Sequence, residues 1–161
     1  MKPRDPRIVE ILNESLTFEL TIVNAHFLHS RMLENWGLPR LAKIFYDMSL
    51  GEMRDADVLI KRILQFEGHP NVQRLNPITI EEDALEILTV TLNAELEAVR
   101  IFNNFAAEAR ALGDNGTAAL LDEAVLDEEK HAYWIESQLS AIEAVGLPAY
   151  LSQQVDSSEV P

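Results

Sequence analysis

The sequence predicts an all-α fold, a bundle of four long helices, from two observations. Four segments of roughly 30 residues are rich in Leu, Ala, Glu and Ile, which favour helix, and they lack the period-two alternation that is typical of strands. Gly and Pro separate these segments, because they fall mainly at residues 3–6, 37–39, 68–77, 113–116 and 146–148. With 161 residues and no cysteine, the chain is most simply one domain over residues 1–161.

The first two helices are expected at residues 6–36 and 39–67. Pro6 fits a first helical turn, where its missing N–H costs nothing. Gly37 and Pro39 then stop one helix and start the next. So short a connection makes the two helices an antiparallel hairpin.

The third helix is expected at residues 80–112, because Thr79 and Glu82 have the spacing of a capping box. Gly113 is suited to end that helix in the left-handed conformation, so a second hairpin follows. The elements after it are expected to be a fourth helix at 115–145, a short helix at 148–154 and a disordered tail at 155–161.

The link between the second and third helices is longer, from Gly68 to about Ile78. A link of this length can run along the whole bundle and return the chain to its other end. A four-helix bundle with one long crossover is the ferritin-like arrangement. The sequence therefore predicts this topology with a short fifth helix at the C-terminus.

Each predicted helix carries an apolar seam with steps of three and four residues, and each seam turns acidic at its middle. The central acids are Glu19, Glu52, Glu95 and Glu128. Glu19 and Glu52 are 33 residues apart, and Glu95 and Glu128 have the same separation. Equal separation in two hairpins puts both pairs at a similar height, so we expect two similar half-sites to face each other.

Asp55 follows Glu52 by three residues and His131 follows Glu128 by three, so each pair shares a helix face and can bind one ion. Buried carboxylates without partners cost several kcal/mol each, and the seams carry no Lys or Arg. A single seam glutamate more often bonds water near a helix end. Four at matched spacing indicate a pair of divalent cations, with iron or manganese favoured and zinc as competitor.

The overall charge agrees with a cation partner. Lys and Arg number 13 against 27 Asp and Glu, which makes the formal net charge −14 and disfavours nucleic acid and anionic membranes as partners. The absence of cysteine excludes disulfides and thiol catalysis. No apolar run approaches the roughly 20 residues of a membrane span, and no signal peptide is evident, so we expect a cytoplasmic protein.

The chain resembles bacterioferritin over nearly its whole length, from about Arg7 to Leu151. The resemblance lies in the segments Phe27–Met32, Asn35–Leu38, Glu52–Asp57, Arg62–Leu64, Asp127–His131 and Gly146–Leu151. It implies a hollow shell of 24 subunits, built from two-fold dimers, that oxidises ferrous iron and stores the ferric mineral. It also implies a di-iron centre in each subunit, haem b shared between two subunits, and a small ferredoxin as reductant.

The resemblance implies the ligand set of that di-iron centre, which would also be the catalytic residues of a ferroxidase. Glu52 and Glu128 would bridge the two irons. Glu19 and Glu95 would each cap one iron, and His131 would donate a nitrogen to one of them.

Asp55 departs from this family pattern, because the family has histidine at that position. A carboxylate is a competent iron ligand, but it is shorter than imidazole, and the extra negative charge would favour ferric over ferrous iron. We interpret His26, where members often have tyrosine, as a supporting or core residue rather than a replacement ligand. His29 is expected to bond at a subunit contact and Glu81 to be solvated. The positions of an inner-surface iron site carry Asp47 and Gly51.

Met53 points to a site for a second cofactor. It follows Glu52 directly, so its side chain is turned about 100° from the metal seam. An isolated methionine there would be ordinary interface packing, but the resemblance implies that Met53 from each of two subunits ligates one haem. The outward stripe around it comprises Leu20, Asn24, Phe27, Arg31, Tyr46 and Leu50.

Three functions follow as hypotheses. The first is an iron-storage subunit with a ferroxidase centre, active or altered by Asp55. The alternative is a ferroxidase-impaired, haem-carrying subunit that supports electron transfer and shell structure beside a catalytic partner subunit, in a hetero-oligomer rather than a homo-oligomer. The third is a di-metal oxidase that stores no iron, against which Met53 and the short segment after Gly146 argue.

Overall fold

The computed structural model describes residues 1–155 and confirms the predicted all-α, ferritin-like bundle. Its helices are α1 (Arg7–Asn35), α2 (Pro39–Gln65), α3 (Ala84–Ala111), α4 (Asn115–Val145) and the short α5 (Leu147–Ser152). Residues 1–155 contain no strand. The expected disordered tail falls almost entirely on residues 156–161, which lie outside the described residues.

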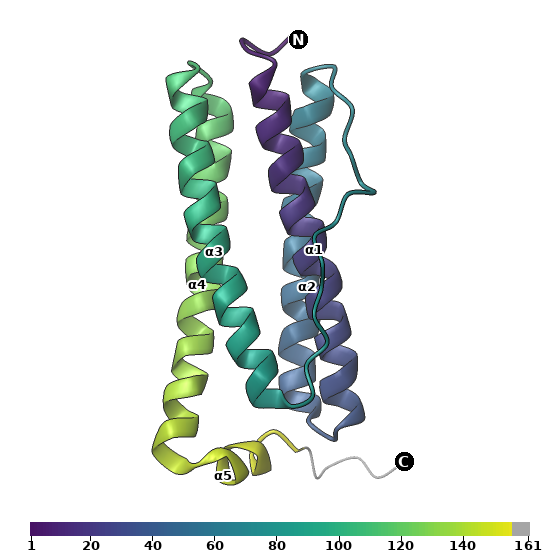
Figure 1. The fold of residues 1–161 in the computed structure, drawn as a ribbon, viewed down its shortest axis with the longest axis vertical. Coiled ribbons are helices and arrows are strands. Elements are labelled where there is room, and N and C mark those ends of the chain that lie inside the picture. The colour runs from purple at the N-terminus through teal and green to yellow at the C-terminus, as the bar shows by residue number, and fades with distance from the viewer. Residues whose placement is uncertain (156–161) are drawn as a thin grey trace.

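The four long helices form two antiparallel hairpins that stand side by side (Figure 1). Helix α1 packs chiefly on α2, and α3 packs chiefly on α4, with a further contact between α1 and α3. Helix α5 lies across one end of the bundle, and there the backbone N–H of Arg40 donates to the carbonyl of Gln154 at 3.3 Å. No helix in the described part of the chain is both long and apolar enough to cross a membrane.

The crossover between α2 and α3 runs along α1, and side chains of α1 accept hydrogen bonds from the backbone of the crossover. The N–H of Asn71 donates to Asn13 Oδ1 at 2.7 Å, and the N–H of Asn76 donates to Thr21 Oγ1 at 2.9 Å. An extended segment without sheet partners needs such bonds for its backbone. The side chains of α1 therefore guide the chain from one end of the bundle to the other.

The third helix begins four residues later than predicted. Asp83 is its N-cap and accepts from the N–H of Glu86 at 2.9 Å, while Glu86 accepts from the N–H of Glu82. Thr79 instead donates its hydroxyl to Glu81, so the expected Thr79–Glu82 capping box is wrong. Asp83 and Glu86 have the same spacing as Thr79 and Glu82, and they cap the helix instead. The other predicted helix ends lie within two residues of those observed.

Apolar clusters fill both ends of the bundle and leave its middle to polar side chains. The cluster next to α5 includes Leu33, Leu41, Phe45, Leu88 and Ile135. The cluster at the opposite end includes Ile8, Leu12, Leu59, Ile63 and Ala118. Between them the four seam glutamates point inward, so the apolar ends hold the helices at the spacing that the middle requires.

Candidate metal centre

One buried glutamate from each long helix meets the others at mid-height of the bundle. Glu19, Glu52, Glu95 and Glu128 are between 0% and 2% exposed. They occupy seam positions, so the same helical period that buries their apolar neighbours also buries them. Their ion pairs within the described residues are with histidines.

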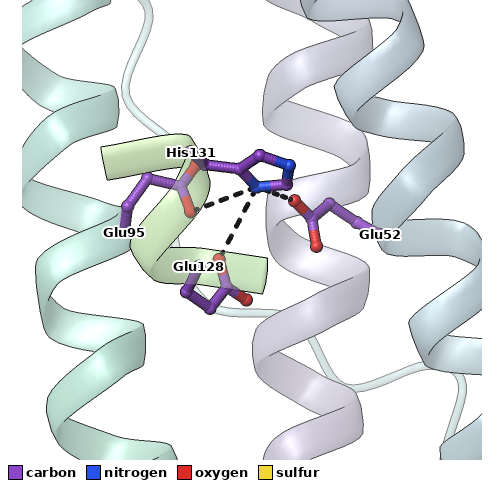
Figure 2. A group of neighbouring side chains, drawn as sticks. All are labelled: Glu52, Glu95, Glu128 and His131. Atoms are coloured by element: carbon purple, nitrogen blue, oxygen red, sulfur yellow. Dashed lines mark ion pairs between the residues drawn. The ribbon is translucent and has the colours of Figure 1, made fainter. Parts of the chain in front are cut away.

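His131 on α4 is the centre of the closest group (Figure 2). Its Nδ1 lies 2.9 Å from Glu52 Oε1, 3.8 Å from Glu95 Oε2 and 3.9 Å from Glu128 Oε2. One ligand atom from each of these four residues lies within 4.8 Å of the other three. Three helices thus direct oxygen and nitrogen donors at one point.

Glu19 and Asp55 lie beside this group rather than in it. Glu19 neighbours both Glu52 and Asp55, and Asp55 is only partly buried. Of the six predicted ligands, the structure brings four into one close group and places these two next to Glu52. A small pocket of about 60 Å³ reaches them, and its wall includes Ser15, Glu19, Asp55, Glu123 and Asp127.

Burial and mutual repulsion keep protons on part of this site. Burial raises the pKa of Glu19, and the charges of Glu52 and Asp55 raise it further. The pKa of Glu128 is raised in the same way, first by burial and then by neighbouring carboxylates. Burial, Glu52 and Asp127 raise the pKa of Asp55 to about 6. Three acids are therefore harder to ionise than they are in water.

Glu95 and His131 behave oppositely and form the charged pair of the site. Burial alone would raise the pKa of Glu95, but hydrogen bonds with Glu128, His131 and His26 outweigh it and lower that pKa. Burial alone would lower the pKa of His131, but Glu52 and Glu95 raise it to about 10. At neutral pH His131 is thus an imidazolium among carboxylates.

The donor atoms fit a pair of divalent cations. Five of them are buried and make no well-aligned hydrogen bond, although His131 Nδ1 forms ion pairs with the carboxylates around it: Glu19 Oε2, Glu52 Oε1, Glu95 Oε2, Glu128 Oε2 and His131 Nδ1. Each such buried atom costs about 1–3 kcal/mol. Carboxylate oxygens with imidazole nitrogen are a donor set that iron accepts. Cations would satisfy these atoms and remove the repulsion together.

His26 stands directly behind one of these ligands. It is 1% exposed, and its Nε2 lies 3.0 Å from Glu95 Oε1. It remains outside the four-residue group, which agrees with its interpretation as a supporting residue.

His29 and Glu81 form a buried pair that sequence reasoning missed. His29 is 3% exposed, and its Nε2 lies 2.7 Å from Glu81 Oε2. The expectation of a solvated Glu81 is therefore wrong, and His29 makes its hydrogen bond within the subunit. The two residues are 52 positions apart, on α1 and on the crossover, so no local pattern could have paired them.

Met53 lies on a different face, turned away from the metal group as predicted. It is 47% exposed, and Phe27 and Leu50 beside it on the outward stripe are 50% and 43% exposed. The rings of Phe27 and Tyr46 are 6.2 Å apart, and the guanidinium of Arg31 lies over both. A contiguous exposed apolar surface of this kind is typical of a binding or assembly face.

Comparisons with known proteins agree with this geometry. A family model described as a ferritin-like domain matches residues 9–145. A bacterioferritin of Brucella melitensis is 38% identical over 146 residues, which are 91% of this chain and 91% of that protein. A bacterioferritin of Mycobacterium avium is 38% identical over 94% of this chain and 95% of its own. A bacterioferritin of Streptomyces coelicolor is 37% identical over 96% and 93%.

Proposed function

The chain belongs to the bacterioferritin family of ferritin-like proteins, which supports iron storage, and on this premise we propose that each subunit oxidises Fe²⁺ at its own di-iron centre. The observation that carries the proposal is the convergence of Glu52, Glu95, Glu128 and His131 within 4.8 Å inside the bundle. The ferric product would enter the cavity of a 24-subunit shell and be stored there as mineral.

In this proposal the six predicted ligands would be shared by two irons. We assign Glu52 and Glu128 as the bridging carboxylates, Glu95 and His131 to one iron, and Glu19 to the other. Asp55, which neighbours Glu52, would complete the coordination of the second iron. The partly buried position of Asp55 supports a ligand that is weaker or less constrained than the others.

The reaction takes one electron from each of two Fe²⁺ ions. With O₂ as oxidant, two Fe²⁺, one O₂ and two protons yield two Fe³⁺ and one H₂O₂. With H₂O₂ as oxidant, two Fe²⁺, one H₂O₂ and two protons yield two Fe³⁺ and two water molecules. His131 would have to release its proton to bind iron, and the raised pKa values of Glu19 and Glu128 also oppose their ionisation, so iron binding at this site should be favoured by higher pH.

The outward face supports a second cofactor. We propose that Met53 from each of two subunits would hold one haem b, and that the apolar side chains around Met53 would line its site. The exposed thioether of Met53 and its apolar neighbours fit that role. Bound haem would supply electron transfer for iron release, with a small ferredoxin as the external reductant.

A second candidate function rests on Asp55. If this carboxylate does not complete the iron site, the chain is a ferroxidase-impaired, haem-carrying subunit, and a second subunit type in a mixed shell oxidises the iron. The position of Asp55 outside the close group of four favours this alternative.

Anaerobic titration of the homogeneous protein with Fe²⁺, followed by addition of O₂, separates the two candidates. We expect fast oxidation that saturates near two irons per subunit. Glu128→Gln should abolish the fast phase, whereas Glu129→Gln, at the exposed adjacent position, should retain it. A wild-type protein with no fast phase under these conditions would favour the ferroxidase-impaired subunit.

A further inference from the structure

Ser15 carries a buried hydroxyl that the fold leaves without a hydrogen-bond partner. The residue lies on α1 one turn before Glu19, so the two side chains share one face of the helix. It is 0% exposed, and its Oγ makes no hydrogen bond within the described residues. A buried hydroxyl without a partner is costly, so this oxygen needs a partner from outside the protein chain.

Two nearby hydroxyls of α1 are satisfied by their own helix. Thr17 Oγ1 donates to the carbonyl of Asn13 at 2.9 Å, and Thr21 Oγ1 donates to the carbonyl of Thr17 at 2.6 Å. A carbonyl four residues earlier is a common partner for Ser or Thr inside a helix. Ser15 makes no such bond in the part of the chain that the structure describes, so its hydroxyl is free to bind a group beside α1.

That group would lie in the small pocket of about 60 Å³ that Ser15 shares with Glu19 and Asp55. Glu19 Oε2 is likewise buried without a hydrogen-bond partner. A bound water molecule needs roughly 10–15 Å³ and two to four polar partners. The pocket meets both conditions, because a hydroxyl and two carboxyl groups contribute to its wall.

Asp55 is the predicted ligand for which such a water matters most. It follows Glu52 by three residues on α2, but it lies outside the close group of four. Its side chain is shorter than the imidazole of histidine. A water molecule bound to the carboxylate extends its reach by about 2.8 Å, the length of an O–H···O hydrogen bond. Asp55 could then hold a metal without any shift of the backbone.

We propose that the Ser15 hydroxyl positions a water molecule through which Asp55 holds the second metal of the centre. The inference rests on the proposed di-iron centre and specifies how its sixth ligand acts. Ser15 is a positioning residue in this account, because it touches the water and not the metal. Its hydroxyl can bond this water and a carboxylate together, since it has one donor and two acceptor sites.

A crystal structure of the metal-free full chain tests the first part of the inference. It should show an ordered water within about 3.2 Å of Ser15 Oγ and of a carboxylate oxygen of Glu19 or Asp55. A Ser15 hydroxyl that bonds a backbone carbonyl of α1, with no water beside it, would overturn the inference.

Metal affinity tests the second part. Ser15→Ala should weaken binding of the second Co²⁺ several-fold in an anaerobic titration and leave the first unchanged, because the water loses one of its partners. Thr17→Val is the matched control, since it removes a buried hydroxyl of α1 that bonds its own helix. Unchanged binding of the second Co²⁺ in Ser15→Ala would contradict the role of the hydroxyl.

A longer side chain at position 55 should make the water unnecessary. Asp55→His supplies an imidazole that can reach the second metal directly. Adding Ser15→Ala to Asp55→His should therefore leave the affinity for the second Co²⁺ unchanged. The same several-fold loss in both backgrounds would show that Ser15 does not act through Asp55, and the proposed link would fail.

The outcomes separate this inference from the proposed function. If the wild-type protein binds two Co²⁺ and oxidises Fe²⁺ rapidly while Ser15→Ala does the same with equal affinities, only the role of Ser15 is overturned. If the wild-type protein binds no second Co²⁺, the proposed two-metal centre is overturned, and the water link to its second metal with it.

Discussion

His131 lies among three carboxylates that would otherwise repel one another. Its raised pKa, about 10, means that it is an imidazolium at neutral pH and compensates part of their charge. The raised pKa values of Glu19 and Glu128 reduce the tendency of these two acids to add further negative charge. Metal binding through His131 must therefore displace its proton, so metal affinity should fall as pH falls.

The proposed role of Asp55 as a ligand of the second iron is tested most sharply by removing its charge. Asp55→Asn should weaken binding of the second metal by about tenfold or more, because an amide carries no charge to hold the ion. Anaerobic titration with Co²⁺, monitored by its absorption, measures both sites without oxidation.

Asp57→Asn is the matched control, since Asp57 lies on the same helix but is exposed and pairs with Lys61. Asp55→His should keep two bound metals per subunit. Two equally tight sites in Asp55→Asn would show that Asp55 is not a ligand.

The same residue makes stability depend on pH. Its pKa rises from 3.8 to about 6 on folding, so its ionised form is disfavoured in the folded, metal-free protein. Asp55→Asn should therefore have no advantage in melting temperature below pH 3.8. The advantage should grow between pH 3.8 and about 6, then stay constant as pH rises further.

Thermal unfolding of the metal-free proteins over this pH range measures the effect. Addition of Co²⁺ at neutral pH should reverse it, because the ion then compensates the charge of the wild-type carboxylate. An advantage of Asp55→Asn that is independent of pH would contradict the burial of Asp55 as its cause.

At the scale of elements, α1 organises both the crossover and the metal centre. It supplies Glu19 to the inside of the bundle and anchors the crossover through Asn13, Thr21 and His29. The His29–Glu81 pair draws the end of the crossover onto α1, and α3 begins only after it. The start of α3 is thus a tertiary outcome as well as a local one.

The N-cap of α3 gives a prediction at this scale. Asp83→Ala should destabilise the subunit by about 1 kcal/mol, because the N–H of Glu86 loses its acceptor. Hydrogen exchange of the first turn of α3 should become faster. Glu82→Ala, at an exposed position outside the cap, should change neither quantity measurably. Equal effects of the two variants would count against Asp83 as the cap.

At the scale of the whole molecule, the bundle has a charged interior and an apolar outer face. The inside of the bundle gathers charge around Glu52, while the outside of α2 exposes the apolar side chains around Met53. Adjacent positions on one helix point about 100° apart, so a single segment can serve both. The bundle is therefore suited to join a partner subunit through one face while its iron chemistry stays inside.

Met53 is the residue on which the haem assignment depends. Met53→Leu should lose bound haem while the shell still assembles, because leucine keeps the apolar contacts and removes the sulfur. The reduced-haem spectrum and the ratio of haem to protein measure this, with size-exclusion chromatography for assembly. Met48→Leu, in the core at 7% exposure, should keep its haem. Full haem content in Met53→Leu would defeat the assignment.

The number of helices, the crossover and the inward set of glutamates could all be predicted, because they follow from local signals. The helical period and the positions of Gly and Pro can be recognised within a few residues of sequence. The equal 33-residue spacings then place the glutamates of the two hairpins at the same height. The start of α3 could not be predicted by the same means, since two capping pairs compete for it. The contact of Glu81 with distant His29 favours the second pair, because it holds Glu81 against α1 ahead of the helix.

The sequence by itself determined that acids line the inside of an all-α bundle at one height. Only the tertiary structure decided that Glu52, Glu95, Glu128 and His131 form the close group while Asp55 stays at its edge. The reason is physical: period and spacing set the height and face of a side chain. Which atoms meet depends on side-chain length and on how the two hairpins pack.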